Sequence, residues 1–252
     1  PALEERWRHS ARQVAPPTTQ NYRVTRFLAL LLCRRMNPRD TQSAVPLLRV
    51  ASLMRYVRYL EAVGAPVGRL LTQAKIPALL LEHPGAAVPR EHAFRFGERA
   101  CRTLGTEHLG LHFGLASLLE DLGTYGGILQ RALTLHEYLQ TGIRLYNTLV
   151  THQRLWLSEA GGELRFNIVT VGDAGLAAYQ SQLETRVVTI ATTSRAARAS
   201  WSPREVSLAY RPRENLPELD LSAGSRVAAG TGETYFTIPR PLLRRHLSQL
   251  NG

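Results

Sequence analysis

The spacing of apolar residues changes along this chain near residue 150, and that change limits the possible folds more than any other feature. Before it, apolar residues such as Val50, Val57 and Leu60 recur at the spacing of an amphipathic helix. After it, Arg154–Ser158 and Glu163–Val171 alternate apolar and polar residues, which is the period of a strand. Helices followed by strands predict an α+β domain.

The segment from Pro46 to Leu149 predicts a series of short helices, because glycine closes helices and proline opens them. The expected boundaries are Gly64, Pro77, Pro89 and Gly105, and the expected segments are 50–63, Val67–Ala74, 90–104, Glu107–Leu115 and, after a turn at Tyr125-Gly126-Gly127, Ile128–Leu133. Thr134 and Glu137 then have the spacing of a capping box, which predicts a helix from Leu135 to about Leu149. In such a box the threonine oxygen accepts the third amide, and the glutamate reaches back to the cap amide.

The second half predicts a hairpin that turns at Gly161-Gly162, followed by a helix and three strands. Asp173 should cap that helix, and Leu176, Leu183, Val187 and Ile190 should form its buried stripe through about Ala199. The expected strands are Glu205–Tyr210, Arg226–Ala229 and Thr234–Ile238, before a last helix from Pro239 to Leu247. The predicted fold is therefore α+β, with a helical N-terminal half and an antiparallel β-β-α-β-β-β sheet packed against helices.

Residues 1–45 differ from the rest, because they are rich in Arg, Pro, Thr and Gln and contain breakers at Pro16-Pro17 and Asn37-Pro38. They predict a poorly ordered leader with a short helix around Thr25–Arg35. The domain proper is expected over residues 46–252.

The net charge of +11, from 31 basic and 20 acidic residues, suggests nucleic-acid binding. Three observations weaken this interpretation: Lys75 is the only lysine, residues 1–45 hold 8 arginines against 3 acidic residues, and no basic run exceeds a pair. A direct contact with phosphates through the arginine-rich surface remains an alternative, carried by the arginines at positions 195, 198, 204, 211 and 213. A solvated charged face that includes Glu205 and Glu214 explains the same arginines.

Two cysteines, Cys33 and Cys101, do not form a disulfide framework in a chain of 252 residues. Cys101 lies on the apolar face of an expected helix, which favours a buried and inert thiol. The longest apolar run, Phe27 to Cys33, is too short to span a bilayer and has no cleavage site after it. We expect a cytoplasmic protein.

Several segments together resemble the N-terminal arabinose-binding-like domain of AraC/XylS-type transcriptional regulators. The resemblance covers about residues 46–247, and the segments that carry it are Val63-Gly-Ala-Pro-Val67 with Leu70-Leu71, Ala87-Val-Pro89 with the helix to Leu104-Gly105, His108-Leu-Gly-Leu-His-Phe-Gly114, Tyr125-Gly-Gly-Ile-Leu129, Leu133-Thr-Leu-His-Glu-Tyr-Leu139, Ser202-Pro-Arg-Glu-Val206 through Tyr210, and Tyr235-Phe-Thr-Ile-Pro-Arg-Pro-Leu-Leu243. Each segment alone is a weak signal, and their order and spacing carry the resemblance.

This resemblance implies a regulatory domain that binds a small-molecule effector and forms a homodimer, with no enzymatic activity and no cofactor. Such regulators carry a C-terminal domain of two helix-turn-helix units, and this chain stops at Gly252, where that domain should begin. We therefore expect either an isolated sensor or a protein that lacks the DNA reader. The domain would change how two DNA-binding domains are presented to half-sites.

Aromatic residues in the middle of the chain are the candidates for an effector pocket, because tyrosine combines an apolar body with a polar handle. The candidates are Tyr125, Tyr138, Tyr146, Trp156, Phe166 and Tyr179. For an anionic effector, Arg144 or Arg165 could supply the clamp. For any single one of these aromatic residues, plain core packing at the helix–sheet boundary is the favoured explanation.

His108 and His112, four residues apart after Glu107, have a spacing that a metal or an enzyme could use. A third ligand is not evident, so no metal is expected, and an enzyme that uses these histidines is kept as an alternative class. His136 beside Glu137 suggests acid–base chemistry, but capping already explains Glu137. Ser202 and Asp173 stand in no nucleophile-elbow context.

Overall fold

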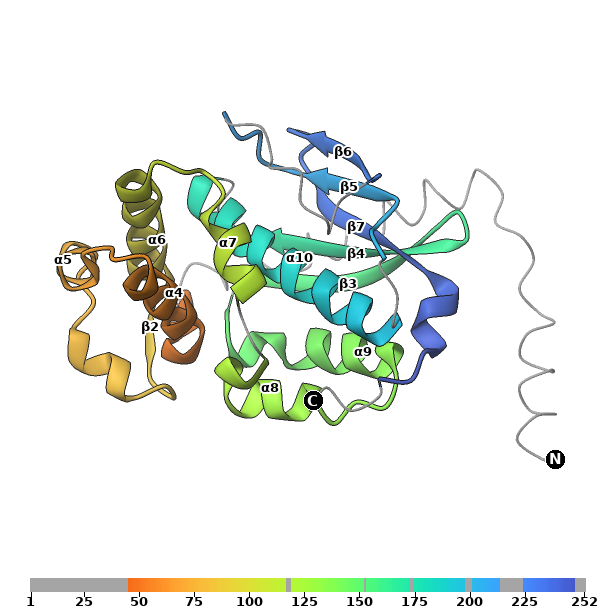
Figure 1. Ribbon diagram of the computed structural model, residues 1–252, viewed down its shortest axis with the longest axis horizontal. Helices are drawn as coiled ribbons and strands as arrows, with labels where there is room; N and C mark the ends of the chain where they lie inside the picture. Colours follow the sequence, from red (N-terminus) through yellow and green to blue (C-terminus); the bar gives the residue numbers. More distant parts are fainter. Residues whose placement is uncertain are drawn as a thin grey trace. The chain divides into compact units, whose positions relative to one another are not determined.

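The computed structural model describes residues 45–116, 119–151, 153–172, 175–197, 201–213 and 224–247, and the structural statements below concern these ranges. Helices dominate the first part and a sheet the second, which confirms the α+β prediction (Figure 1). Within these ranges no helix is both long and apolar enough to cross a membrane. Residues 1–44 of the expected leader, with its helix at Thr25–Arg35, lie outside the described residues, as do Asp173, Arg198 and Glu214.

The first group of helices ends close to the expected boundaries. It consists of α4 (Val50–Ala62), α5 (Val67–Gln73), the 3₁₀ helix η1 (Ala78–Glu82) and α6 (Arg90–Leu104). Pro89 precedes α6, and Gly105 closes it in the left-handed conformation with φ of 67°. A small antiparallel sheet, β1 (Leu47–Arg49) with β2 (Ala87–Pro89), joins the starts of α4 and α6. The sequence did not predict these strands because three residues are too few to show alternation.

The next group of helices differs from expectation at α8. The group consists of α7 (Leu109–Ala116), the 3₁₀ helix η2 (Leu119–Leu122), α8 (Thr124–Leu129), α9 (Leu135–Leu145) and the 3₁₀ helix η3 (Tyr146–Thr148). Helix α8 begins before the predicted Ile128 start, and Tyr125-Gly126-Gly127 lies inside it instead of forming a turn. A Cβ on Gly126 would lie 1.7 Å from the carbonyl oxygen of Leu119. This glycine therefore permits close packing of α8 on η2.

One of the two hydrogen bonds of the predicted capping box before α9 is present in the structure. The Thr134 hydroxyl oxygen accepts the amide of Glu137 at 3.1 Å, which confirms Thr134 as the N-cap. The carboxylate of Glu137 accepts the amide of Leu133 at 2.8 Å and not that of Thr134. Thr134 instead pairs with His246 in an isolated antiparallel bridge, so this segment is tied to the C-terminal part of the domain.

The large sheet has the strand order β3-β4-β7-β5-β6. Its strands are β3 (Gln153–Ala160), β4 (Glu163–Thr170), β5 (Glu205–Leu208), β6 (Arg226–Ala229) and β7 (Thr234–Pro239). The hairpin β3–β4 is confirmed, but the sheet is not wholly antiparallel because β5 and β6 are parallel. A parallel pair needs a connection of about a dozen residues or more, and residues 209–225 meet that requirement. The segment after β7 is a 3₁₀ helix, η5 (Arg240–Arg244), and not the predicted helix to Leu247.

Helix α10 (Leu176–Ala197) lies across one face of the sheet (Figure 1). Of the predicted stripe, Leu183, Val187 and Ile190 are fully buried, whereas Leu176 at the start of the helix is half-buried. On the sheet, the rings of Phe166 and Phe236 stack with their centroids 5.2 Å apart beneath this helix. Helix α10 carries buried polar residues as well, so it is enclosed on several sides.

Helix α7 crosses α10 at glycine residues. A Cβ on Gly110 would lie 2.2 Å from the carbonyl oxygen of Gln180, and one on Gly114 would lie 3.1 Å from Cβ of Val187. The Gln180 side chain accepts the Gly110 amide at 2.6 Å and donates to the Glu107 carbonyl at 2.5 Å. Gly110 and Gly114 are thus close-approach residues that fix where α10 lies.

Cys101 is buried in α6, as predicted. Burial raises the pKa of its thiol from 9 to about 12, so the thiolate that reacts with disulfide reagents is scarce near neutral pH.

In a Cys33→Ser background we expect native Cys101 to react with Ellman's reagent at least about 100-fold more slowly than the unfolded chain at pH about 8. Because the folded pKa is the higher one, this thiol also lowers native stability as the pH rises above 9 toward 12.

The measurement is the rate of absorbance increase with and without urea, with free cysteine as the control. Labelling at the unfolded rate under native conditions would contradict the buried position of Cys101.

Candidate ligand-binding cavity

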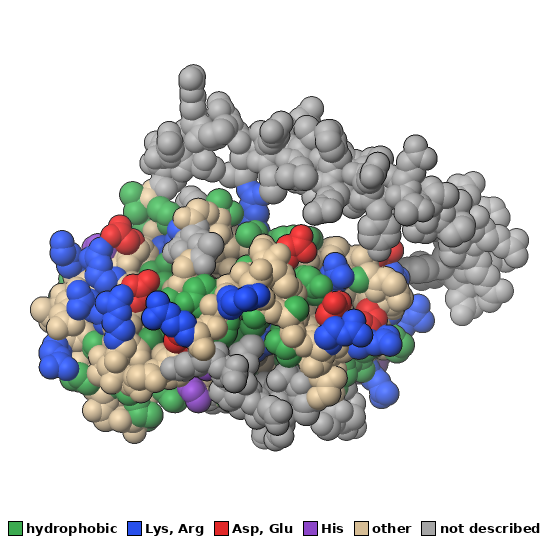
Figure 2. All heavy atoms as spheres, turned by 90° about the horizontal axis from the view of Figure 1, so that it is seen from above, with side chains coloured by type: hydrophobic (Ala, Val, Ile, Leu, Met, Phe, Trp, Pro, Cys, Tyr) green, Lys and Arg blue, Asp and Glu red, His purple; other side chains and the backbone are tan. Residues whose placement is uncertain are grey.

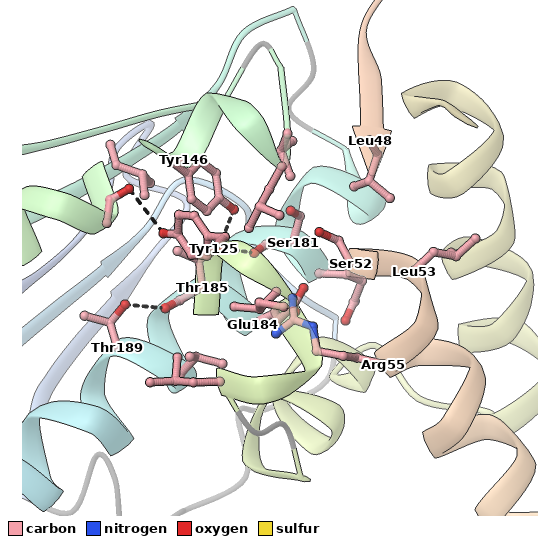
Figure 3. A pocket seen from close by; sticks show the side chains of 18 of the residues that line it. Leu48, Ser52, Leu53, Arg55, Tyr125, Tyr146, Ser181, Glu184, Thr185 and Thr189 are labelled. Carbon is pink, nitrogen blue, oxygen red and sulfur yellow. Dashed lines mark hydrogen bonds and ion pairs between the residues drawn. The ribbon is translucent and has the colours of Figure 1, made fainter. Parts of the chain in front are cut away.

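A cavity of about 80 Å³ lies where α4, α6, α8, α9 and α10 meet the first strands of the sheet (Figure 3). A single water requires roughly 10–15 Å³ on this kind of measure, so the cavity has room for a small organic molecule. Most of the wall is apolar, and it includes Leu48, Leu53, Ala93, Phe94, Leu119, Leu122, Leu129, Leu139, Ile143, Leu149, Val150, Leu155, Phe166 and Val188.

Arg55 and Glu184 form a buried ion pair in the cavity wall. Their side chains are each only 8% exposed, and the guanidinium of Arg55 lies against the Glu184 carboxylate (Figure 3). Arg55 comes from α4 and Glu184 from the middle of α10, so the pair ties these helices together. The hydroxyl of Tyr56, also on α4, donates to Oε2 of Glu184 at 3.2 Å. A lone buried charge is strongly unfavourable, and the pair removes that problem for both groups.

Burial and the neighbouring groups shift the pKa of Glu184 in opposite directions. Burial raises the pKa of the Glu184 carboxyl, and Arg55 and the Tyr56 hydrogen bond oppose that rise. Burial also raises the pKa of Tyr56 well above 10, so this phenol stays protonated and remains a donor. The site therefore holds one positive and one negative group that compensate each other.

A row of hydroxyls follows α10 along the cavity at a spacing of four residues. Thr185 donates to the Ser181 carbonyl at 2.9 Å, and Thr189 donates to the Thr185 carbonyl at 2.8 Å. These bonds to the preceding helical turn satisfy hydroxyls that are shielded from water. Ser181 itself donates to Oε1 of Gln153 at 3.3 Å.

Three tyrosines close the cavity from the side of α8, α9 and η3. Tyr125 donates to the Gly142 carbonyl at 3.1 Å, and Tyr138 donates to Thr192 at 3.3 Å. The Tyr146 hydroxyl lies 3.1 Å from Oε1 of Gln153 and 3.0 Å from the Thr185 hydroxyl. Burial raises the pKa of Tyr146 to about 12, so it stays protonated. Tyr125 and Tyr146 also meet edge to face, with centroids 6.4 Å apart.

The structure brings four of the seven candidate residues to this cavity, namely Tyr125, Tyr138, Tyr146 and Phe166. The other three, Arg144, Trp156 and Tyr179, do not line it. Trp156 pairs with Asn167 on the face of the sheet opposite Phe166, because side chains alternate along a strand, and it is 44% exposed.

Arg144 and Tyr179 lie outside the cavity because of the helical period. Arg144 is exposed on α9, while Leu139, Gly142 and Ile143 face inward. Tyr179 stands on the side of α10 away from Ser181 and Thr185, where its hydroxyl is 3.1 Å from Nδ1 of His108.

The second candidate clamp, Arg165, is engaged elsewhere. Its guanidinium lies 3.6 Å from the Glu205 carboxylate and 4.2 Å from the ring centroid of Tyr235. Among the other surface arginines, Arg204, Arg211 and Arg213 are exposed. Figure 2 shows basic side chains spread along one face of the molecule, with acidic side chains beside several of them.

The histidines singled out in the sequence are separated by their environments. His108 is buried against Tyr179, whereas His112 stacks on Tyr59 with centroids 6.4 Å apart. His136 is exposed beside the capping residue Glu137. In the described part of the chain, no group of three His, Cys, Asp or Glu residues could hold a metal ion.

Sequence reasoning missed the polar residues of the cavity, above all Ser52, Arg55, Ser181, Glu184 and Thr185. A signal for them was present in α10. Between Leu176 and Ser194 this helix has only two charged residues, Glu184 and Arg186, and its other polar residues are Gln, Ser and Thr. A surface helix normally carries a charged face, so this composition indicates a helix enclosed on all sides. Arg55 gave no comparable signal.

A sequence profile described as the arabinose-binding domain of AraC transcription regulators, N-terminal, matches residues 64–247. Among solved structures, the chain is similar to the transcriptional regulator CdpR from Pseudomonas aeruginosa, with 19% sequence identity and a TM-score of 0.50. That similarity covers 74% of this chain and 57% of the CdpR chain, and at this identity it concerns the fold alone. No curated protein matches the sequence.

Proposed function

This chain belongs to the family of N-terminal arabinose-binding domains of AraC transcription regulators, and on that premise we propose that its domain, residues 46–252, is a sensor for a small-molecule effector. The effector binds in the cavity between α4 and α10. The observation that carries the proposal is the cavity itself, with apolar walls and a few polar groups, which is the usual composition of a small-molecule site.

The proposed contact residues include the four predicted aromatic residues Tyr125, Tyr138, Tyr146 and Phe166. Arg55 takes the role that the sequence had suggested for Arg144 or Arg165. Because both α4 and α10 line the cavity, a bound effector can favour one arrangement of these two helices over another. Such a preference is required, since a ligand that binds two states equally shifts neither.

In the proposed mechanism, this domain acts as a cytoplasmic homodimer and catalyses no reaction. DNA binding is carried by a separate helix-turn-helix domain, and the effector changes how two such domains meet their half-sites. Residues 1–45 are a leader outside the sensor. In this proposal the sensor domain makes no direct contact with DNA.

A thermal-shift screen of small metabolites tests the sensor function. A ligand present at about 100 times its Kd stabilises the native state by about 2.7 kcal/mol, which raises the Tm by roughly 5–10 °C in a domain of this size. Size-exclusion chromatography of the same samples measures the dimer. A screen with no stabilising compound, together with a monomer at all concentrations, would contradict the proposal.

A cavity-filling variant ties any such ligand to this site. Gly97 lines the cavity from α6, and no atom lies within 4 Å of the position that its Cβ would take. We expect Gly97→Leu to occupy the space and to reduce the ligand-induced rise in Tm to less than about a third of its original value. The control is Gly68→Leu on α5, where the added side chain also meets no atom within 4 Å but is exposed. Equal ligand responses of the two variants would place the ligand elsewhere.

A further inference from the structure

Most polar groups of the cavity residues already have hydrogen-bond partners within the protein, and only a few donors are without one. Tyr125, Tyr138, Tyr146, Ser181, Thr185 and Thr189 all have partners within the protein. The Gln180 side chain accepts from the amide of Gly110 on α7 and donates to the carbonyl of Glu107 just before that helix. The carboxylate of Glu184 is engaged by Arg55 and by Tyr56.

Three polar atoms of the cavity wall have no hydrogen-bond partner among the described residues. One of them, Oε1 of Glu184, is held in the ion pair with Arg55, and the other two both come from α4. They are Oγ of Ser52 and Nε of Arg55, in residues that are 4% and 9% exposed. Residues three apart on a helix share one face, so the two groups lie together in the wall (Figure 3). A buried polar group without a partner is unfavourable, so a ligand that supplies an acceptor there gains affinity.

The charge of the site limits what that acceptor can be. Arg55 is already neutralised by Glu184, so an added carboxylate would leave the buried site with an excess negative charge. An ammonium group would find the Glu184 carboxylate occupied by Arg55 and Tyr56 and would leave an excess positive charge. A sugar fits poorly as well, because each of its hydroxyls needs a partner and most of the wall is apolar.

We infer that the effector is a small uncharged molecule with a mainly apolar body and a single carbonyl-type oxygen, which accepts hydrogen bonds from Ser52 Oγ and Arg55 Nε. This inference rests on the proposed sensor function of the cavity. Ketones, lactones, esters and amides share this chemistry. The oxygen defines the orientation of the molecule, and the apolar walls hold its body.

Four probes of similar size separate the possible chemistries: cyclopentanone, cyclobutanecarboxylate, cyclopentylammonium and L-arabinose. Their affinities for the full chain are measured by ligand-observed NMR titration near neutral pH. We expect cyclopentanone to bind at least about tenfold more tightly than each of the other three, since about 1.4 kcal/mol corresponds to a factor of ten. Tighter binding of the carboxylate, the ammonium or the sugar would overturn the inference and leave the sensor function standing.

Ser52→Ala is the variant that tests the contact. It removes an unpartnered hydroxyl, so the Tm of the free protein should stay the same or rise. The affinity for cyclopentanone should fall about five- to tenfold, the usual effect of one lost hydrogen bond. In the control Thr189→Val, the lost hydroxyl already bonds to the Thr185 carbonyl, and the affinity should change less than about twofold.

Four outcomes would overturn the inference. An unchanged cyclopentanone affinity in Ser52→Ala would overturn the inference, as would equal losses in Ser52→Ala and Thr189→Val. Cyclopentanone binding that survives in Gly97→Leu would place the probe outside the cavity and overturn it too. Failure of every probe to bind, together with an empty metabolite screen, would remove the sensor function and with it this inference.

Discussion

Replacing Arg55 with methionine is expected to lower the free energy of unfolding by about 3–5 kcal/mol, because it leaves the Glu184 carboxylate buried without its counter-charge. Methionine keeps much of the length and flexibility of the arginine stem, so the effect comes mainly from the charge. The measurement is urea denaturation of the single variant against the original chain. A loss of about that size would rank this pair among the most important single contacts of the domain.

The double variant Arg55→Met/Glu184→Gln separates the charge effect from a packing effect. It removes both charges, so we expect it to be more stable than Arg55→Met alone by about 2 kcal/mol or more. The control is Arg95→Met, which breaks an exposed ion pair with Glu91 and should cost less than about 1 kcal/mol. A double variant no more stable than the single one would show that the ion pair is not the cause.

The pH dependence of Arg55→Met follows from the same charge. Burial raises the pKa of Glu184, and removal of Arg55 takes away the main opposing effect. For an acid whose folded pKa is raised, stability is greatest below the unfolded pKa of 4.5 and falls as the pH rises through the folded pKa. The deficit of Arg55→Met should therefore be smaller at about pH 5 than at about pH 8. An equal deficit at both pH values would contradict an ionised, buried Glu184.

The second large effect is expected for Gly110→Ala. The new Cβ would lie 2.2 Å from the Gln180 carbonyl oxygen and 2.9 Å from its carbonyl carbon, both of them backbone atoms that cannot turn aside. Helices α7 and α10 must therefore separate, and we expect a loss of about 3 kcal/mol in the free energy of unfolding. The separation also disturbs the two hydrogen bonds of the Gln180 side chain.

Gly97→Ala in α6 is the matched control for the cost of the substitution itself. Its Cβ meets no atom within 4 Å, and alanine restricts the unfolded chain and favours helix, so it should stabilise the protein by about 0.4–1 kcal/mol. Denaturation of both variants under the same conditions compares them directly. Similar stabilities of the two variants would contradict the close approach of α7 to α10.

The local elements could be predicted because their causes lie within a few residues. The helical spacing of Val50, Val57 and Leu60 gave α4, and the alternation around Gly161-Gly162 gave the hairpin. Thr134 began α9 because its side chain caps an amide three residues away. The predicted start of α8 was wrong because its cause is not local: the role of Gly126 depends on how closely η2 approaches it.

The pairing of strands could not be predicted in the same way. The partners β1 and β2 are three residues each and lie far apart in sequence, and the parallel direction of β6 depends on the path of a long connection. Alternation shows that a segment is a strand, but it carries no information about its neighbour.

The cavity shows the same division between sequence and structure. The sequence by itself indicated that tyrosines of the central helices and Phe166 of the hairpin are candidates for one site, because they cluster in the middle of the chain. Only the tertiary structure decided that Arg55 and Glu184 lie together in the wall of the cavity, while Trp156 and Arg144 lie outside it. Helical and strand periods arise from backbone geometry over a few residues. Helices α4 and α10 meet through Tyr56 and Glu184, which are 128 residues apart in the sequence. This contact arises from packing of the whole chain, which leaves no periodic pattern in the sequence.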